Sequence, residues 1–447
     1  MRGMSIARAA TACAGRVCGA DDPNIELKHI VIDSRAVCPG DLFVAYKGEK
    51  VDGHDYMAAA FQKGAACCLA ERLPEGVTGP VLLVEDVQRA VEQIAAEYRK
   101  DLTLPIVGVT GSVGKTSAKE MVAAVLSQRF RVLKTEGNLN NQIGVPMTLS
   151  RIEPEHQAAV VEMGISGFGE MRLLSSIARP TLGVFTVIGH AHLEFLQDLD
   201  GVLRAKTEML ENMPEDAVIV VNGDDEKLRD FHCRQRKLTV GLGPDCELRA
   251  EDIRLSEGET AFTLVCGEER VPLRVPAFGQ HMVYAALEGA AVGRLLGLRW
   301  EEIAAGVAAY QVVGRRGAVT DTGRITLIDD SYNANPDSVK SSIDTLKKLP
   351  GRHVCILGDM LELGEGSADM HRDVGRYARQ QGMDAVYAAG QYGAALCEGA
   401  GEIGRCFDSR DALIAALPEL VRCGDSVLVQ ASRGMRFEAV AEALKEL

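Results

Sequence analysis

Length, composition and charge already narrow the classes of protein to which this chain could belong. Its 447 residues are enough for roughly three domains, and a hydrophobic fraction of 47% is ordinary for a globular protein. The net charge of −14 argues against nucleic acid as a general partner. No apolar stretch reaches the length of a membrane span, and Arg8 interrupts the segment where a signal peptide would have its apolar core.

The cysteine content predicts a reducing compartment rather than a disulfide framework. The 12 cysteines are irregularly spaced in a large chain, and no C-x-x-C pair occurs. Cys67 and Cys68 are adjacent within an apolar run, as expected for small core residues. Disulfide frameworks are typical of small secreted domains. We therefore expect reduced thiols and a cytoplasmic protein.

The predicted elements fall into three blocks, residues 1–100, 101–313 and 314–447. In each block, helical stretches alternate with short apolar runs that are typical of strands. The runs are 30–32, 42–45 and 81–84; then 106–110, 158–163, 182–188 and 217–221; then 325–328, 354–357, 385–388 and 426–429. This alternation indicates parallel, doubly wound sheets. We expect an α/β protein with a smaller N-terminal α/β domain, a central domain with a doubly wound parallel sheet, and a C-terminal Rossmann-like domain.

The central block opens with a pattern that is typical of a phosphate-binding loop. The apolar run 106–110 leads into G-S-V-G-K-T-S (111–117), and a helical stretch follows. In such loops the backbone N–H groups hold an anion, a lysine reaches the outer phosphates, and a hydroxyl holds Mg²⁺. The strict spacing would need glycine at position 109, which is Val109. The loop alone leaves kinases, GTPases, ligases and motor ATPases open.

Polar residues follow several predicted strands, where ligands of parallel sheets bind. Glu162 lies near the end of one run, His190 and His192 follow the next, and Asp330 follows a run in the third block. A carboxylate among apolar neighbours needs a partner such as Mg²⁺, yet a surface glutamate fits equally well. Taken alone, His192 is either a metal ligand or a packed loop histidine. Lys206 is most simply a solvated lysine on a helix.

A series of strings, in order along the whole chain, resembles the Mur ligase family. They are D-S-R-A-V-C-P-G-D-L-F-V-A (33–45), D-G-H-D (52–55), T-G-S-V-G-K-T-S (110–117), G-N-L-N-N-Q-I-G-V-P (137–146), E-M-G (162–164), A-H-L-E (191–194), A-K-T-E (205–208), I-D-D-S-Y-N-A-N-P-D-S (328–338), G-D-M-L-E-L-G (358–364) and S-R-G-M (432–435). The strings at 328–338 and 358–364 are similar to one branch of the family. That branch adds D-alanyl-D-alanine to a UDP-N-acetylmuramoyl tripeptide.

The resemblance implies an activity and its partners. It implies an ATP-dependent ligase of peptidoglycan synthesis that forms an amide bond through an acyl phosphate, with ATP and Mg²⁺ as cofactors. It implies UDP-N-acetylmuramoyl tripeptide and D-alanyl-D-alanine as substrates. It also implies a uridine-nucleotide-binding N-terminal domain (1–100), an ATP-binding central domain (101–313) and a C-terminal ligase domain (314–447). We expect a cytoplasmic monomer.

The resemblance also implies roles for individual residues. The implied catalytic residues are Lys115, Glu162, His192 and Lys206. The implied ATP contacts are Gly111, Ser112, Val113, Gly114, Lys115, Thr116, Ser117, Asp330 and Asn335. The implied substrate contacts are Ser34, Arg35, Asn138, Asn141 and Arg433. The implied Mg²⁺ ligands are Thr116, Glu162, His192 and Lys206, the last as a carbamate, which converts a cation into an anion.

Three positions depart from the family pattern. Met282 and Ala285 stand where asparagines are expected, one of them an adenine contact, and Gln430 stands where relatives carry lysine. These departures keep open a catalytically weakened nucleotide-binding paralogue. Another amide ligase of the superfamily, such as the enzyme adding the third amino acid or a folylpolyglutamate synthase, is a further alternative. A kinase or GTPase is disfavoured because it leaves the first and third blocks without a role.

Overall fold

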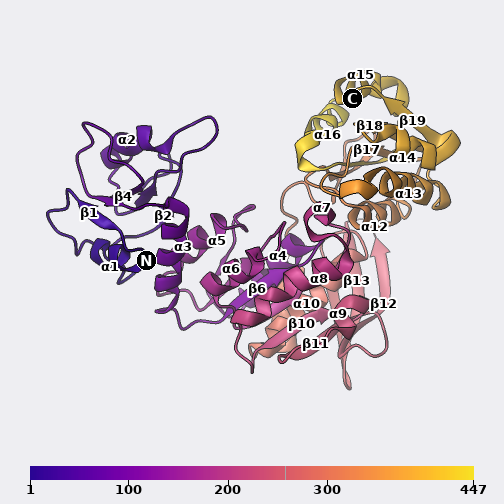
Figure 1. The fold of residues 1–447 in the computed structure, drawn as a ribbon. Helices are drawn as coiled ribbons and strands as arrows, with labels where there is room; N and C mark the ends of the chain where they lie inside the picture. The colour runs from indigo at the N-terminus through magenta and orange to yellow at the C-terminus, as the bar shows by residue number, and fades with distance from the viewer. Residues whose placement is uncertain (257) are drawn as a thin grey trace.

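Three β-sheets follow one another along the chain. The structure, a computed structural model, describes residues 1–256 and 258–447. Figure 1 shows the N-terminal part at one end, the C-terminal part at the other, and the central part between them. Each sheet is built from strands of only one of these parts. The α/β class expected from the sequence is confirmed.

The N-terminal sheet has five strands in the order β1-β5-β4-β3-β2. β2 to β5 run parallel, and β1 pairs antiparallel with β5. The strands are β1 (Arg16–Cys18), β2 (Ile30–Val31), β3 (Leu42–Val44), β4 (Cys67–Ala70) and β5 (Val81–Leu83). The helices are α1 (Ile6–Ala12), η1 (Gly53–Tyr56), α2 (Met57–Gln62) and α3 (Val87–Arg99). Cys67 and Cys68 are fully buried free thiols, as expected.

The central sheet has nine strands in the order β14-β13-β12-β11-β10-β9-β6-β8-β7. Its strands are β6 (Ile106–Thr110), β7 (Val132–Lys134), β8 (Ala158–Glu162), β9 (Leu182–Phe185), β10 (Val218–Asn222), β11 (Arg236–Gly241), β12 (Leu248–Ser256), β13 (Glu259–Cys266) and β14 (Glu269–Val275). The strands from β7 to β12 pair in parallel, which gives the doubly wound core that the sequence predicts.

Beyond that parallel core, β12, β13 and β14 form an antiparallel meander that the sequence analysis did not anticipate. Buried and exposed side chains alternate along much of all three strands, as in a sheet with one solvated face. The sequence carries this alternation with a period of two residues, but these segments lack the continuous apolar runs on which the strand predictions rest.

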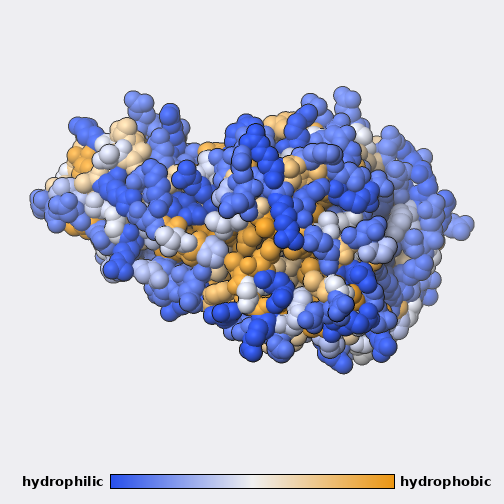
Figure 2. All heavy atoms as spheres, turned by 90° about the horizontal axis from the view of Figure 1, so that it is seen from below, coloured by the Kyte–Doolittle hydropathy of each residue, from blue (hydrophilic) through white to orange (hydrophobic). Residues whose placement is uncertain are grey.

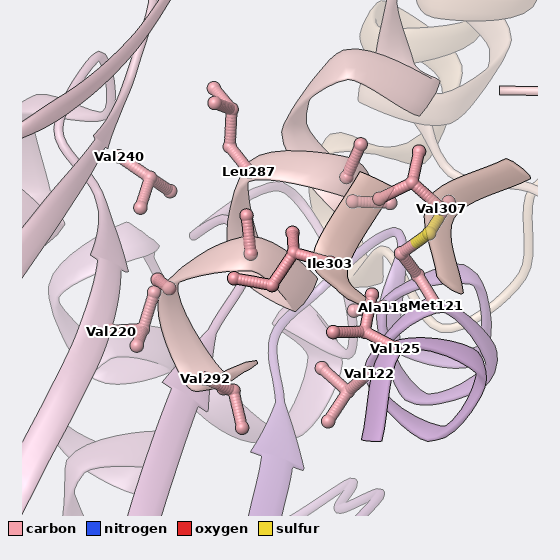
Figure 3. Close-up of a cluster of buried hydrophobic side chains, with 14 of the residues drawn as sticks. Ala118, Met121, Val122, Val125, Val220, Val240, Leu287, Val292, Ile303 and Val307 are labelled. Atoms are coloured by element: carbon pink, nitrogen blue, oxygen red, sulfur yellow. The ribbon is translucent and has the colours of Figure 1, made fainter. Parts of the chain in front are cut away.

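Helices cover both faces of the central sheet. They are α4 (Lys115–Leu126), α5 (Gly144–Ser150), α6 (Glu170–Ala178), α7 (Leu193–Leu196), α8 (Leu199–Thr207), η2 (Glu208–Asn212), α9 (Glu226–Asp230), α10 (His281–Leu295) and α11 (Trp300–Ala308). Figure 3 shows α4, α10 and α11 packing together beside the strand residues Val220 and Val240. A Cβ added to Gly306 of α11 would lie 2.4 Å from the Cα of Val125, so α11 and α4 approach closely. This packing fixes the helix whose first residue is Lys115.

The C-terminal sheet has six strands in the order β15-β16-β20-β17-β18-β19. β15 pairs antiparallel with β16, and the other pairs are parallel. The strands are β15 (Ala318–Asp321), β16 (Thr326–Asp330), β17 (His353–Leu357), β18 (Ala385–Ala389), β19 (Gly404–Phe407) and β20 (Ser426–Gln430). The helices are α12 (Pro336–Leu346), η3 (Gly364–Gly366), α13 (Ser367–Gln380), α14 (Gly393–Ala400), η4 (Gly401–Ile403), α15 (Arg410–Leu420), η5 (Arg433–Met435) and α16 (Glu438–Lys445).

The face of the molecule drawn in Figure 2 is mostly hydrophilic. Figure 2 shows hydrophilic residues over most of the face seen from below, with an apolar area near its middle. Among the helices of the described residues, none combines the length and the apolar character that crossing a membrane requires.

Candidate active site

The loop after β6 is held in one conformation by close contacts with the strand next to it. Gly111 has a φ of +146°, and a Cβ there would lie 1.9 Å from the hydroxyl oxygen of Thr186. The Thr186 hydroxyl donates to the carbonyl of Val113 at 2.5 Å. The Ser112 hydroxyl donates to the carbonyl of Gly189 and accepts from its N–H. Only glycine fits at position 111, and the loop leads directly into the N-terminus of α4, an arrangement suited to anion binding.

Lys115 is folded back over this loop. Its Nζ donates to the carbonyls of Gly111 at 2.7 Å and Ser112 at 3.3 Å. Burial lowers its pKa, although the nearby carboxylate of Glu162 acts in the opposite direction. A lysine in this place is suited to neutralise the charge of phosphates bound at the loop.

Glu162 joins three elements at the carboxyl end of β8. The hydroxyl of Thr116 donates to its carboxylate at 3.0 Å, and the amide of Asn140 donates to the other oxygen at 2.8 Å. Lys119 Nζ lies 3.8 Å away and also donates to the carbonyl of Thr135 at 2.8 Å. Only 1% of Glu162 is exposed, so this carboxylate is part of a buried polar network and not a surface glutamate. Lys119 and Asn140 are not among the predicted site residues.

Lys206 is buried in α8, with an exposed fraction of 1%. Burial shifts its pKa well below the usual value, and the positive charge of Lys115 adds to that shift. No carboxylate of the described residues forms an ion pair with it. The interpretation of Lys206 as a solvated helix lysine is therefore excluded by the structure.

His192 and His190 contact carboxylates of the C-terminal domain. His192 has a φ of +56° and lies at the start of α7, and its Nδ1 is hydrogen-bonded to Glu362. The backbone N–H of His190 donates to Asp337 at 2.5 Å, and its ring Nδ1 lies 3.0 Å from the same oxygen. Hydrogen bonding to Asp337 raises the pKa of His190. These contacts join the loop after β9 to the C-terminal domain.

The oxygen donors at the loop fit Mg²⁺. Mg²⁺ prefers oxygen ligands and is usually held by one or two protein carboxylates together with water and substrate phosphates. The Thr116 hydroxyl and the Glu162 carboxylate provide two adjacent donors of that kind. Nowhere in residues 1–256 and 258–447 do three His, Cys, Asp or Glu side chains gather into a metal-binding group. The structure therefore groups Thr116 with Glu162, and it places His192 against Glu362.

In the C-terminal domain, the two predicted nucleotide contacts differ. Asp330 ends β16, accepts from Ser342 at 2.9 Å, and has its pKa raised to about 7 by burial. Asn335 caps α12, because its side-chain oxygen accepts from the N–H of Ser338 at 2.8 Å and its own N–H donates to the Ser338 hydroxyl. The side-chain oxygen of Asn335 is therefore already used by the helix cap.

Arginine side chains stack on an aromatic ring beside these residues. The guanidinium of Arg316 lies 3.9 Å from the centre of the Tyr332 ring, and that of Arg433 lies 5.0 Å from it. The predicted substrate contact Arg433 therefore belongs to a cationic cluster at the carboxyl end of the C-terminal sheet.

The three departures from the family pattern are buried. Met282 and Ala285 lie in the core of the central domain, and Met282 also lines a cavity of about 130 Å³ with Tyr310 and Arg316. Gln430 is 1% exposed and donates to the Ser338 hydroxyl at 3.1 Å, while its side-chain oxygen has no hydrogen-bond partner among the described residues.

The remaining predicted residues lie in separate places. Arg35 is highly exposed and pairs with Asp33 at 2.8 Å, next to Ser34 in the N-terminal domain. Asn138 is exposed, and the side chain of Asn141 accepts from the N–H of Gly144 at 3.0 Å at the start of α5. The structure does not bring any of these side chains into hydrogen-bonding contact with Lys115 or Glu162.

Three α/β domains, with a phosphate-binding loop beside a buried carboxylate, define a nucleotide-dependent enzyme. Comparison of the sequence with known protein families leads to an enzyme of this class. Residues 26–99 match the catalytic domain of the Mur ligase family, residues 109–293 match the Mur ligase middle domain, and residues 314–433 match the Mur ligase glutamate ligase domain.

Individual proteins match over nearly the whole length. The UDP-N-acetylmuramoyl-tripeptide–D-alanyl-D-alanine ligase of Escherichia coli (strain K12) is 37% identical over 440 residues, covering 97% of this chain and 96% of the relative. A crystal structure of MurF from Acinetobacter baumannii has a TM-score of 0.91 at 31% identity and 99% coverage of both chains. A MurF ligase from Thermotoga maritima in complex with ADP has a TM-score of 0.82 at 28% identity, covering 94% of this chain and 97% of that one. The chain belongs to the Mur ligase family.

Proposed function

We propose that this chain is an ATP-dependent ligase that joins D-alanyl-D-alanine to UDP-N-acetylmuramoyl tripeptide in peptidoglycan synthesis, releasing ADP and phosphate. The observation that carries the proposal is the similarity to the Escherichia coli ligase of that name over 97% of the chain. The proposal is also supported by the hydrogen bond of Lys115 to the loop at Gly111 and by that of Thr116 to the buried Glu162 beside it. The Thermotoga maritima relative bound to ADP supports the use of ATP.

The chemistry requires an activated carboxyl group, because a carboxylate is not attacked by an amine at neutral pH. A carboxylate oxygen of the tripeptide attacks the γ-phosphorus of ATP, the bond to the ADP oxygen breaks, and an acyl phosphate forms. The amine of D-alanyl-D-alanine then attacks the acyl carbon, loses a proton and displaces phosphate. Lys115 and the N-terminus of α4 hold the phosphates and offset their charge as two anions approach.

The metal ligands are proposed as Thr116 and Glu162, with His192 and Lys206 at a second position. Bound Mg²⁺ would neutralise phosphate charge and orient the phosphoryl group. The Thr116 hydroxyl and the Glu162 carboxylate are already 3.0 Å apart. The network of Asn140 and Lys119 holds that carboxylate in place before any ligand arrives.

Lys206 is proposed to act as a carbamate. Its lowered pKa favours the neutral amine, whose nitrogen attacks CO₂ to form a C–N bond with loss of a proton. The product is an anion near Lys115, which would repel the protonated amine but attracts the carbamate. A carbamate at Lys206 is therefore consistent with a buried lysine that forms no ion pair with a carboxylate.

The other domains are proposed to bind the rest of the two substrates. We assign uridine-nucleotide binding to residues 1–100 through Ser34 and Arg35, and ATP contacts to Asp330 and Asn335 in residues 314–447. The further substrate contacts proposed are Asn138, Asn141 and Arg433. We also propose that the enzyme is a cytoplasmic monomer.

An ADP-release assay tests the function. The protein is mixed with ATP, Mg²⁺, UDP-N-acetylmuramoyl tripeptide and D-alanyl-D-alanine, and each substrate is omitted in turn. We expect release that depends on both. Release with L-lysine or glutamate in place of D-alanyl-D-alanine would indicate another ligase of the superfamily. Nucleotide binding without ADP release would indicate a weakened paralogue. In that case the first substitutions to test are lysine for Gln430 and asparagine for Met282, the residues expected from the family.

A further inference from the structure

Glu362 of the C-terminal domain is the residue that contacts the ring of His192. The Nδ1 of His192 is hydrogen-bonded to the Glu362 carboxylate, and the backbone N–H of Glu194 donates to the Glu362 carbonyl at 3.1 Å. The two residues are 170 positions apart in sequence and belong to different domains. The pair is about half-exposed, since 24% of the His192 side chain and 46% of the Glu362 side chain are accessible.

We propose that Glu362 is a positioning residue that fixes the tautomer and direction of the His192 ring, so that Nε2 is free to bind the divalent metal of the reaction. This inference rests on the metal-binding role proposed above for His192. In this role, Glu362 itself contacts neither the metal nor the substrate. A central-domain ligand is thereby oriented by the C-terminal domain, so metal binding at His192 depends on how the two domains meet.

The chemistry of the pair supports this role. A carboxylate accepts hydrogen bonds and does not donate them when ionised, so the proton of the neutral ring lies on Nδ1. Nε2 then carries a free lone pair. Histidines that bind metals commonly donate their other ring N–H to a carboxylate, which also raises the basicity of the ligand.

Glu362 is held firmly by its own domain. The N–H of Leu361 donates to the hydroxyl of Ser432 at 2.8 Å, and the N–H of Met360 donates to the ring of His371 at 2.8 Å. His371 is fully buried and lies 2.6 Å from the carbonyl of Ser367. Glu362 and His192 both adopt left-handed backbone conformations, with φ of +63° and +56°, which non-glycine residues rarely adopt without a requirement.

The same interface offers a matched control. His190 and Asp337 form a second histidine–carboxylate pair between the same two domains, and Asp337 lies 2.5 Å from the backbone N–H of His190. His190 is not proposed as a metal ligand. Disrupting either pair should therefore weaken the contact between the domains to a similar extent. Only a substitution of Glu362 should disturb the orientation of the His192 ring.

The experiment compares Glu362→Ala, Asp337→Ala and His192→Ala in the full chain. Mn²⁺ binding in the presence of a non-hydrolysable ATP analogue is measured by electron paramagnetic resonance, and the ring tautomer of His192 by ¹⁵N NMR. We expect Glu362→Ala to weaken one Mn²⁺ site by about 10- to 100-fold and to move the His192 proton from Nδ1 toward Nε2. Asp337→Ala should leave both readouts close to those of the unmodified chain.

The outcomes separate this inference from the function on which it rests. If His192→Ala removes a Mn²⁺ site but Glu362→Ala does not weaken it, the positioning role of Glu362 is wrong and the ligand role of His192 stands. If His192→Ala leaves Mn²⁺ binding unchanged, the ligand role is wrong and the inference fails with it. Equal losses of Mn²⁺ affinity in Glu362→Ala and Asp337→Ala would show that the pair of His192 and Glu362 only joins the two domains. That result would also overturn the inference. Glu362→Gln retains an acceptor oxygen, so partial recovery of the tautomer and of Mn²⁺ affinity is expected.

Discussion

The phosphate-binding loop and the C-terminal part of the site differ in which domain supplies the hydrogen-bond partners of their side chains. At the loop, Lys115 and Thr116 are hydrogen-bonded within the central domain, and Glu162 is held by Asn140. In the C-terminal part, Asp337 and Glu362 find their partners on the central domain. The loop is therefore built before domains meet, whereas the C-terminal contribution depends on how the domains are arranged.

The largest effect is expected from Lys115→Ala. The variant removes the ammonium that lies over the loop, so we predict a loss of at least about 10³-fold in ADP release at saturating substrates. Arg433→Ala is the matched change in the C-terminal part, and there we predict a loss of about 10-fold. Comparable losses from the two variants would contradict a preformed loop that carries most of the charge stabilisation.

Lys206→Ala is expected to cost about 10²-fold or more in activity, because a buried anion next to Lys115 would be lost. Excess bicarbonate should not restore it, since no amine remains to be carbamylated. In the unmodified chain, ¹³C-bicarbonate should give a carbamate carbon signal that disappears in Lys206→Ala. Full activity of the variant, or the same signal in both proteins, would overturn the carbamate role.

Gly306→Ala tests how closely α11 packs against α4, the helix that follows the loop. The new Cβ would lie 2.4 Å from the Cα of Val125, a backbone atom that cannot move aside easily. We predict a loss of about 1–3 kcal/mol in the free energy of unfolding, measured with urea, even though alanine favours the helix. Gly293→Ala is the control, because the atom nearest its Cβ would be a side-chain atom, the Cγ1 of Val125 at 2.8 Å, and not a backbone atom. A loss as large in the control would show that backbone approach is not the cause.

The sequence was most informative where the signal is local. Three features are each encoded by a local pattern of about ten residues: the run 106–110, the glycines of the loop, and the polar residue at the end of β8. The structure places them side by side. The sequence does not show which asparagine of the segment 138–141 contacts Glu162. The turn of the backbone directs Asn140, and not its neighbours, toward that carboxylate. Asn335 carried a local signal that was overlooked, since asparagine followed by proline is typical of a helix start. The pairing of His192 with Glu362 spans two domains, and no local pattern encodes it.

The smallest predicted effect concerns Asp330 and depends on pH. Its pKa is about 7 in the folded protein, raised by burial from a usual value near 3.8. The folded state thus binds more protons than the unfolded state between about pH 4 and 7, so this carboxyl lowers stability as the pH rises through that range. The full shift corresponds to about 4 kcal/mol at pH 8, but Asp330 is only partly buried, so Asp330→Asn, which cannot ionise, should gain about 1 kcal/mol over the unmodified chain at pH 8 and nearly nothing at pH 4.

Thermal unfolding at a series of pH values measures this difference. Ser342→Ala is the control, because it removes the hydrogen bond to Asp330 but keeps the carboxyl group. That bond favours the ionised form and lowers the pKa, so its loss should extend the destabilised range of the parent to higher pH. A pH-independent difference between Asp330→Asn and the unmodified chain would mean that folding does not raise the pKa of Asp330.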